Sequence, residues 1–307
     1  MRFGRYLVLE SLLGDGFLTR ARIDPLSAPR ESYRDSARDR AVHEPIALYR
    51  FEDALLEGEW HEGSQPQVAD DLRHRFEGFI ACAPLLRGEP NLTDIFEVGK
   101  LERHYFVAME LVQGVDSFAL TRAPAPLPIV LFVAAEVARG LAALHARAIM
   151  HPELSPSDIV ITNAGRTVLS GLFPRLLKGK PYWVAPERIR GEPCGARSDL
   201  FSVGLVLFRL LTGRNVVEAE SDYALVVAMQ GWSSPPRASS FRADVPADVD
   251  RILNRMLAAA PDDRYASAQE VERDLRAALE VISPGFGAAD LAAYVARLAL
   301  PTTFAMP

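Results

Sequence analysis

The short stretch Ile149–Val160, which reads IMHPELSPSDIV, gathers side chains that could do chemistry. Glu153 is a carboxylate that could accept a proton from a hydroxyl group, and Asp158 could hold a divalent cation. Two absences in the sequence limit what can assist them: residues 159–186 contain no Asp or Glu, and residues 1–99 contain no Lys. Residues 159–186 therefore offer no carboxylate as a second metal ligand, and residues 1–99 offer no lysine to bind an anionic group.

The composition excludes several classes of protein. The 307 residues are 49% hydrophobic and 24% charged, which suits one large globular domain or two lobes. The net charge of −6 argues against a nucleic-acid partner, and Cys82 and Cys194 form neither a disulfide framework nor a metal-ligand pattern. The N-terminus lacks the apolar core of a signal peptide, and the apolar runs are too short to span a bilayer. We therefore expect a cytoplasmic protein with no membrane or nucleic-acid partner.

Apolar patterning divides the chain into a strand-rich first third and a helical remainder. Alternation and glycine breaks predict strands over residues 5–23 (as a hairpin), 45–51, 92–98 and 104–112. Helical spacing predicts helices over residues 67–86, 129–148, 201–211, 248–257 and 269–282. This order favours an α+β fold with two lobes.

Eight short motifs follow one another over roughly residues 5–283. They are GDG at Gly14–Gly16, IALY at Ile46–Tyr49, AMELV at Ala108–Val112, HPELSPSD at His151–Asp158, LSGLF at Leu169–Phe173, APE at Ala185–Glu187, SDLFSVG at Ser198–Gly204 and PDDRYAS at Pro261–Ser267. In this order and at these spacings they resemble the landmarks of bacterial eukaryotic-like Ser/Thr protein kinases. The resemblance implies a bilobal protein-kinase-like fold, with a small β-sheet lobe that carries one large helix and a larger helical lobe.

The resemblance also sets the expected domains. Residues 1–112 would form the small lobe, with a mobile surface loop over residues 24–44, and residues 113–283 would form the large lobe. Residues 284–307 would form a C-terminal helical tail, which either docks back on its own lobe or binds a partner.

The positions that brace the family's large lobe keep the family's residue types. Glu187 would pair with Arg264, and Asp199 would stand at the head of the long buried helix. A buried Glu–Arg pair needs both partners, because one stranded charge costs several kcal/mol.

The positions that the family uses for phosphoryl transfer carry other residue types. The departures are Tyr49 for the phosphate-gripping lysine, Phe79 for its glutamate partner, Pro152 for the arginine and Glu153 for the aspartate of the catalytic loop, Ser155 for its lysine, Asp158 for its asparagine, and Gly171 for the second metal-binding aspartate. Tyr49 and Phe79 are either ordinary core packing or rings that fill the phosphate end of the cleft. We expect no catalytic residue and no metal site from this set.

The activation segment departs from the family in the same direction. Only residues 174–184 separate GLF from APE, and residues 171–184 contain no Ser or Thr. Lys180 stands where the family has a threonine. Regulation by Ser/Thr autophosphorylation is therefore not expected.

A nucleotide pocket is still conceivable at the family's positions. Its residues would be Gly14, Gly16, Ala47, Met109, Glu110, Val112 and Val160.

These observations predict a catalytically inactive kinase-like domain (a pseudokinase), which is not an enzyme and uses no cofactor. It would act as a signalling scaffold or allosteric partner of an unidentified protein, either an active kinase or the substrate of one. Two alternatives stay open. One is a divergent Ser/Thr protein kinase with residual ATP-dependent transfer, in which Glu153 is the base and Asp158 the sole metal ligand. The other is a nucleotide sensor that binds ATP weakly without Mg²⁺.

Overall fold

The structure, a computed structural model, divides into two compact units. The sheet unit spans Met1–Val112 and Phe173–Leu176, and the helical unit spans Gln113–Leu172 and Leu177–Pro307. The residues it describes are 2–3, 6–11, 18–23, 46–52, 66–101, 104–122, 124–173, 181–298 and 303–304. The predicted loop over residues 24–44 and most of the activation segment lie outside the described residues.

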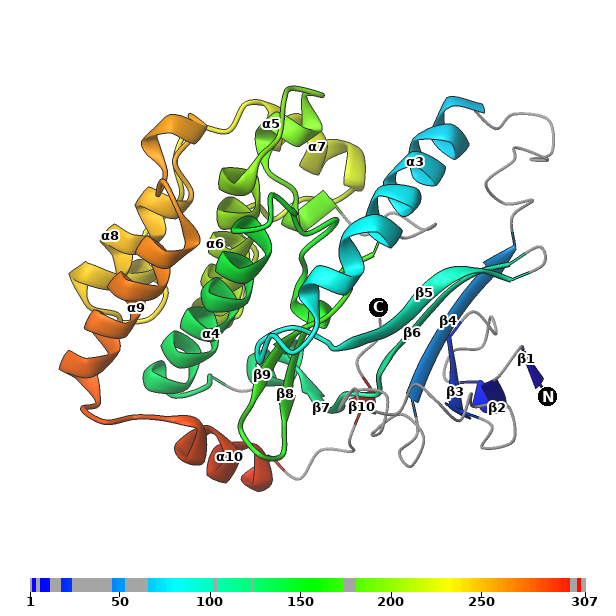
Figure 1. The fold of residues 1–307 in the computed structure, drawn as a ribbon. Helices are drawn as coiled ribbons and strands as arrows, with labels where there is room; N and C mark the ends of the chain where they lie inside the picture. The colour runs from blue at the N-terminus through cyan, green and yellow to red at the C-terminus, as the bar shows by residue number, and fades with distance from the viewer. Residues whose placement is uncertain are drawn as a thin grey trace. The chain divides into compact units, whose positions relative to one another are not determined.

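A six-stranded antiparallel sheet forms the frame of the sheet unit (Figure 1). In sheet order its strands are β1 (Arg2–Phe3), β2 (Tyr6–Ser11), β3 (Leu18–Ile23), β4 (Ile46–Glu52), β6 (His104–Glu110) and β5 (Ile95–Leu101). Strands β2 and β3 form the predicted hairpin. Side chains from the middle of this sheet, among them Ile46, Leu48 and Phe106, make a small apolar core.

Helix α3 (Pro66–Cys82) packs against this sheet through its aromatic residues. Phe76 is fully buried, and its ring lies edge-on to the ring of Tyr105 on β6, with centroids 5.3 Å apart. The predicted helix over residues 67–86 ends as an α-helix at Cys82, and a 3-10 turn, Ala83–Leu86, follows. Pro84 explains the change, because proline removes a backbone donor and clashes with the preceding helical turn.

The helical unit contains seven α-helices and a small sheet among its described residues (Figure 1). The helices are α4 (Leu127–His145), α5 (Pro186–Ile189), α6 (Ala196–Thr212), α7 (Asp222–Gln230), α8 (Ala247–Met256), α9 (Ala268–Ile282) and α10 (Ala288–Arg297). In sheet order the strands are β10 (Thr303–Phe304), β7 (Gln113–Asp116), β8 (Ile159–Thr162) and β9 (Thr167–Leu169). Short 3-10 turns cover Ser117–Thr121, Pro156–Asp158, Pro181–Trp183, Ala238–Ser240 and Pro261–Asp263.

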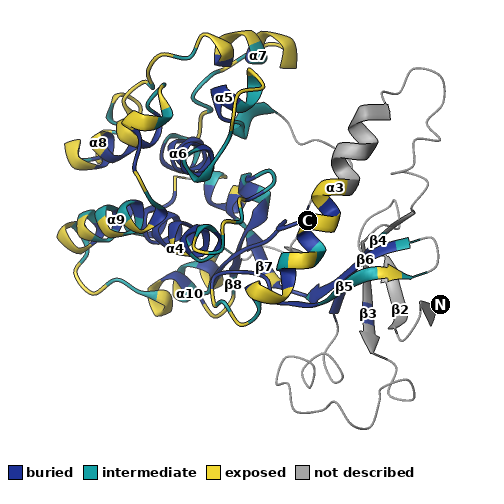
Figure 2. Cartoon of the chain, turned by 45° about the horizontal axis from the view of Figure 1, so that its top comes forward, coloured by how far each residue is buried: buried dark blue, intermediate teal, exposed yellow. Residues whose placement is uncertain are grey.

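Helices α4 and α6 form the core of the helical unit, and Figure 2 shows both as largely buried. Within the described ranges, α4 is the one helix long and apolar enough to cross a membrane, but 78% of its apolar window is buried inside the protein. It is therefore a core helix by its packing. It ends at His145, before the predicted end at Ala148, which has a left-handed backbone (φ 56°) that an α-helix excludes.

Helix α6 begins earlier than predicted, at Ala196, and ends where Gly213 adopts the left-handed conformation (φ 71°). Helices α8 and α9 agree with the predicted ranges to within one residue at every end. Helix α7 was not predicted. Its N-terminus is capped by the hydroxyl of Ser221, which accepts a hydrogen bond from the amide of Ala224 at 3.2 Å. The predicted α+β architecture, with a strand-rich first part and a helical remainder, is confirmed.

Candidate functional site

The catalytic-loop motif forms a tight turn in which Asp158 is the central acceptor. Its carboxylate is fully buried, and Oδ2 accepts hydrogen bonds from the amide of Ser155 at 2.8 Å and from the Ser155 hydroxyl at 2.6 Å. Short bonds to an ionised carboxylate are among the stronger hydrogen bonds in proteins. Asp158, which one of the open alternatives makes the sole metal ligand, therefore caps its own turn, Pro156–Asp158.

The same turn is tied to the segment that leads to Gly171. The carbonyl of Asp158 accepts hydrogen bonds from the amide of Ser170 at 2.7 Å and from its hydroxyl at 3.1 Å. The Ser170 carbonyl in turn accepts a bond from Nε2 of the buried His151 at 2.8 Å. Because a carbonyl can only accept, this places the ring proton of His151 on Nε2.

Asp199, at the start of α6, holds the beginning of the loop. Its Oδ2 accepts a hydrogen bond from the His151 amide at 2.9 Å and also lies 2.9 Å from Nε2 of His145. Asp199 is 2% exposed, so both bonds form away from water. Asp199 was predicted to brace the large lobe, whereas no role was predicted for His145, in the predicted helix 129–148.

Pro152 and Glu153 are both half-buried. The guanidinium of Arg188, on α5, donates a hydrogen bond to the Pro152 carbonyl oxygen at 2.5 Å. The loop is therefore held from the α5 side through its backbone, at the position where the family has an arginine side chain.

Gly171 is buried and has a left-handed backbone (φ 70°), which glycine adopts without strain. It offers no side-chain ligand. Leu172 and Phe173, which follow it, are 4% and 1% exposed.

In the sheet unit, three buried rings meet where the resemblance implies an ion pair. Tyr49 on β4 lies 4.8 Å from Phe173, and Phe79 on α3 lies 6.0 Å from Phe173, both measured between ring centroids. All three side chains are buried, with exposed fractions of 7%, 5% and 1% for Tyr49, Phe79 and Phe173. We call Tyr49, Phe79 and Phe173 the aromatic cluster. Tyr49 and Phe79 were among the predicted site residues, and Phe173 was not.

The residues of the predicted nucleotide pocket are distributed over both units. Ala47 on β4 is the register partner of Met109 on β6, and both are buried. Glu110 is half-buried and Val112 is buried at the end of the sheet unit. Val160, on β8, is buried within the helical unit, and Gly14 and Gly16 lie outside the described residues.

The predicted bracing pair is present in the helical unit. Arg264 makes two parallel hydrogen bonds to Glu187, Nη1 to Oε1 at 2.7 Å and Nη2 to Oε2 at 2.9 Å, and the Ser198 hydroxyl donates to Oε1 at 2.7 Å. Burial opposes the charged form of Glu187, but the bonds from Arg264 and Ser198 outweigh it, so the pKa of Glu187 lies below its usual value. The guanidinium also lies over the ring of Phe201, 4.6 Å from its centroid.

The residues that the resemblance assigns to Mg²⁺ and to the phosphates of ATP lack the donors that these groups need. Tyr49 carries no charge, Gly171 has no side chain, and Asp158 already accepts two bonds from Ser155. Within the described parts of the chain, no three His, Cys, Asp or Glu side chains gather as metal ligands do. The described residues therefore do not fit the family's way of holding Mg²⁺ and the phosphates.

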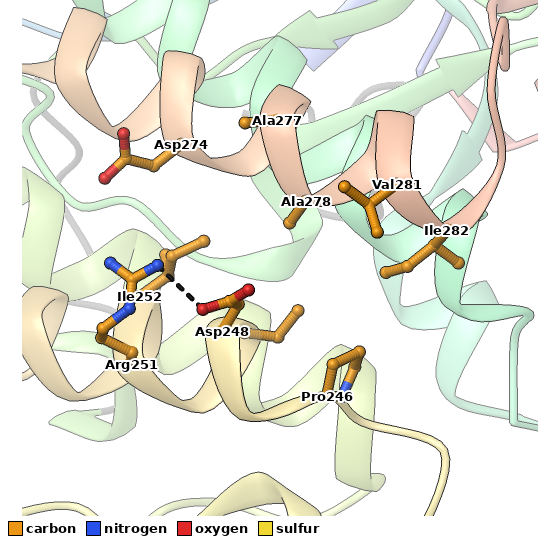
Figure 3. Close-up of a pocket in the computed structure, with 10 residues that line it drawn as sticks. Pro246, Asp248, Arg251, Ile252, Asp274, Ala277, Ala278, Val281 and Ile282 are labelled. Carbon is orange, nitrogen blue, oxygen red and sulfur yellow. Dashed lines mark hydrogen bonds and ion pairs between the residues drawn. The ribbon is translucent and has the colours of Figure 1, made fainter.

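A groove of about 240 Å³ runs between α8 and α9 in the helical unit (Figure 3). Its floor includes the buried Val249 and Ile252, and its rim carries Asp274 and an Asp248–Arg251 pair at 3.0 Å. None of the predicted site residues lines it.

The comparisons with known proteins agree with the motifs. A model of the protein kinase domain matches residues 80–275. The tyrosine-protein kinase MasK of Myxococcus xanthus is 32% identical over 234 residues, which cover 67% of this chain and 36% of MasK. The serine/threonine-protein kinase PknL of Mycobacterium tuberculosis is 32% identical over 207 residues, which cover 62% of this chain and 51% of PknL. The chain thus spans about a third to a half of the length of these relatives.

Solved structures show the same fold. The PknI kinase domain of Mycobacterium tuberculosis superposes with a TM-score of 0.67 at 23% identity, covering 90% of this chain and 96% of that one. At this identity the likeness concerns the fold alone.

The comparisons correct two predictions. The prediction that the chain is not an enzyme is wrong, because the matching domain and its curated relatives are protein kinases. The prediction of no cofactor is wrong for the same reason, since protein kinases normally need ATP and Mg²⁺.

Proposed function

The chain belongs to the bacterial eukaryotic-like Ser/Thr protein kinase family, and we propose that it acts in the signalling of that family together with a protein partner. The partner is an active kinase or the substrate of one. In this role the chain is a scaffold or an allosteric partner in ATP-dependent phosphorylation.

The observation that carries this proposal is the aromatic cluster. Rings of Tyr49, Phe79 and Phe173 pack where the family's motif has a lysine–glutamate pair, with centroid distances of 4.8 and 6.0 Å. An apolar cluster keeps α3 against the sheet by burial and needs no bound charge to hold its position. A fold held in this way offers a fixed surface to a protein partner.

The bracing of the helical unit supports the same role. The Glu187–Arg264 pair and the bonds of Asp199 to His145 and His151 keep the loops that surround α6 in place. The helical unit, where Glu187, Arg264 and Asp199 keep the family's residue types, therefore also keeps the family's architecture.

We also propose that the chain works in the cytoplasm. Two findings support this location: α4 is buried as a core helix, and both cysteines, Cys82 and Cys194, are free thiols.

Affinity capture tests the proposal. The full chain carrying a tag is expressed in cells of its source organism, and captured proteins are quantified by mass spectrometry against the tag alone. We expect one kinase, or one protein phosphorylated by a kinase, to be enriched. If nothing is enriched over the tag in repeated captures with and without chemical cross-linking, the proposed role is contradicted.

A second candidate function is ATP-dependent protein phosphorylation by the chain itself. It is favoured by the names of the relatives, which are kinases, and by the half-buried carboxylate of Glu153 at the position of the family's catalytic aspartate. A carboxylate at this place could accept the proton of a substrate hydroxyl. Transfer of ³²P from labelled ATP that is lost in Glu153→Gln and kept in the exposed control Glu220→Gln would support it.

A further inference from the structure

Helix α7, with the sequence DYALVVAMQ, is apolar around most of its circumference. Leu225 and Met229, one turn apart, are each 1% exposed and attach the helix to the helical unit. A helix that is apolar on all sides is normally buried inside a protein. Figure 2 shows instead that most of α7 is exposed.

The exposed residues of α7 form one continuous apolar surface. Tyr223 and Val227, one turn apart, are 80% and 49% exposed. Ala224 and Ala228, which follow them along the helix, are exposed as well. We call these four residues the α7 face. Single exposed apolar residues are normal on a protein surface, but a contiguous group of them marks an interaction site.

The α7 face has a defined conformation in the chain on its own. At the start of the helix, the Ser221 hydroxyl accepts a hydrogen bond from the Ala224 amide at 3.2 Å. At its end, the guanidinium of Arg190 on the next residue after α5 donates a hydrogen bond to the Gln230 carbonyl at 3.4 Å. A surface that is already ordered loses less conformational entropy when it binds.

The charges beside the α7 face are negative. Glu218, Glu220 and Asp222, at or just before the start of the helix, are all exposed. A partner with lysine or arginine next to its apolar residues would be attracted to this surface, and an acidic one would be repelled. A second copy of the chain fits poorly, because a symmetric pair of α7 faces brings the same carboxylates together.

We propose that the α7 face binds a segment of a protein partner in which apolar side chains are flanked by lysine or arginine. The inference rests on the proposed function in taking a protein as the partner, and it adds the chemistry of that partner. Burial of the apolar side chains supplies the affinity. The carboxylates select a basic segment and speed its association.

A peptide library tests the site without requiring an identified partner. The probe is a library of random dodecapeptides displayed on phage and selected on the full chain. The enriched peptides are synthesised with a fluorescein label, and their binding is measured by fluorescence anisotropy. We expect them to combine apolar residues with a net positive charge. Their affinity should fall between about 0.1 M and about 1 M salt, because the screening length shortens from about 10 Å to about 3 Å.

A double variant removes the two large side chains of the α7 face. Tyr223→Ser/Val227→Ser should lower the affinity for the enriched peptides about tenfold or more, since burial of one large apolar side chain is worth about that factor. Val281→Ser is the matched control, because Val281 is 85% exposed on a different helix, α9. It should bind the peptides as the parent chain does. Circular dichroism should show that all three chains are folded, since the changed residues are exposed.

A second pair of variants tests the charges. Glu218→Gln/Glu220→Gln keeps the size of both side chains and removes two negative charges, so it should weaken peptide binding about threefold. Glu280→Gln is the control, because Glu280 is exposed on α9. It should leave the affinity unchanged.

Four results would overturn the inference: no enriched peptide, enriched peptides with a net negative charge, equal affinity of the two serine variants, or equal affinity of the two glutamine variants. A dimer of the full chain that is lost in Tyr223→Ser/Val227→Ser, seen by light scattering, would also overturn it, since a second copy would then cover the α7 face. These measurements are independent of partner capture. A failed peptide experiment thus leaves the proposed function standing, and a failed capture leaves the α7 face standing.

Discussion

Replacing Arg264 by methionine should destabilise the helical unit more than any surface substitution. The guanidinium is fully buried and makes two bonds to Glu187, whose side chain is 2% exposed. It also donates to the carbonyls of Ala258 and Ala259. Arg264→Met leaves the Glu187 carboxylate buried without its cation. Breaking a buried pair in this way costs about 3–5 kcal/mol.

The magnitude converts into a measurable shift of the melting temperature. For a unit of this size, 1 kcal/mol corresponds to about 2–4 °C, so Arg264→Met should lower the melting temperature by about 6–20 °C. The assay is thermal unfolding followed by circular dichroism. Arg297→Met is the matched control, because Arg297 is exposed, on the last turn of α10. It should change stability by less than about 0.5 kcal/mol.

A double variant separates the interaction energy of the Glu187–Arg264 pair from the energy of the other contacts that the two residues make. In Glu187→Leu/Arg264→Met both charges are gone, so the double variant should be more stable than Arg264→Met alone. The interaction energy from the double-mutant cycle should be about 1–3 kcal/mol. If Arg264→Met melts within about 2 °C of the parent chain, the pair does not brace the helical unit and the reasoning fails.

Three further predictions concern Tyr49, Glu187 and Asp158. Tyr49→Lys puts a charge at a site that is 7% exposed and should destabilise the sheet unit by about 3 kcal/mol or more. Tyr49→Phe should cost about 1 kcal/mol or less. Thermal unfolding of both variants measures this difference in stability. Because the pKa of Glu187 is lower in the folded than in the unfolded chain, its contribution is complete above the usual glutamate pKa of about 4.3 and is lost as the pH falls through the folded value. The free energy of unfolding in urea should therefore fall between pH 6 and acid pH, and it should fall less in Glu187→Gln. An equal fall in both chains would show that Glu187 is not the cause. Asp158→Ala removes the acceptor of both Ser155 bonds and should cost about 1–3 kcal/mol, while retention of full stability would show that the cap is dispensable.

The elements that the sequence predicted best are those with one apolar face. Helix α8 alternates buried residues such as Val249 and Ile252 with exposed ones such as Asp248 and Arg251, so its period is visible in the sequence. Helix α7 escaped prediction because its exposed face is apolar too. Tyr223 is 80% exposed and Val227 49% exposed, so the contrast between faces that marks a surface helix is missing.

In the candidate site, a contact between residues close in the sequence could be predicted, and a contact between distant residues could not. The bond between Ser155 and Asp158 could have been anticipated from the sequence, since Ser-x-x-Asp is a capping pattern at three-residue spacing. The contact of Tyr49 with Phe173 could not, because the two residues are far apart along the chain and only tertiary packing brings their rings together. Sequence patterns of helices and strands carry no information about such a pair.

Reconstitution of phosphorylation with the captured partner tests the central claim most directly. The rate of ³²P transfer from labelled ATP in the partner's own reaction is measured with and without an equimolar amount of the full chain. The proposed role predicts that the folded chain changes this rate. It also predicts that the strongly destabilised Arg264→Met variant leaves the rate unchanged when the assay is run above the melting temperature of that variant. A rate that is the same with and without the folded chain would contradict the proposal.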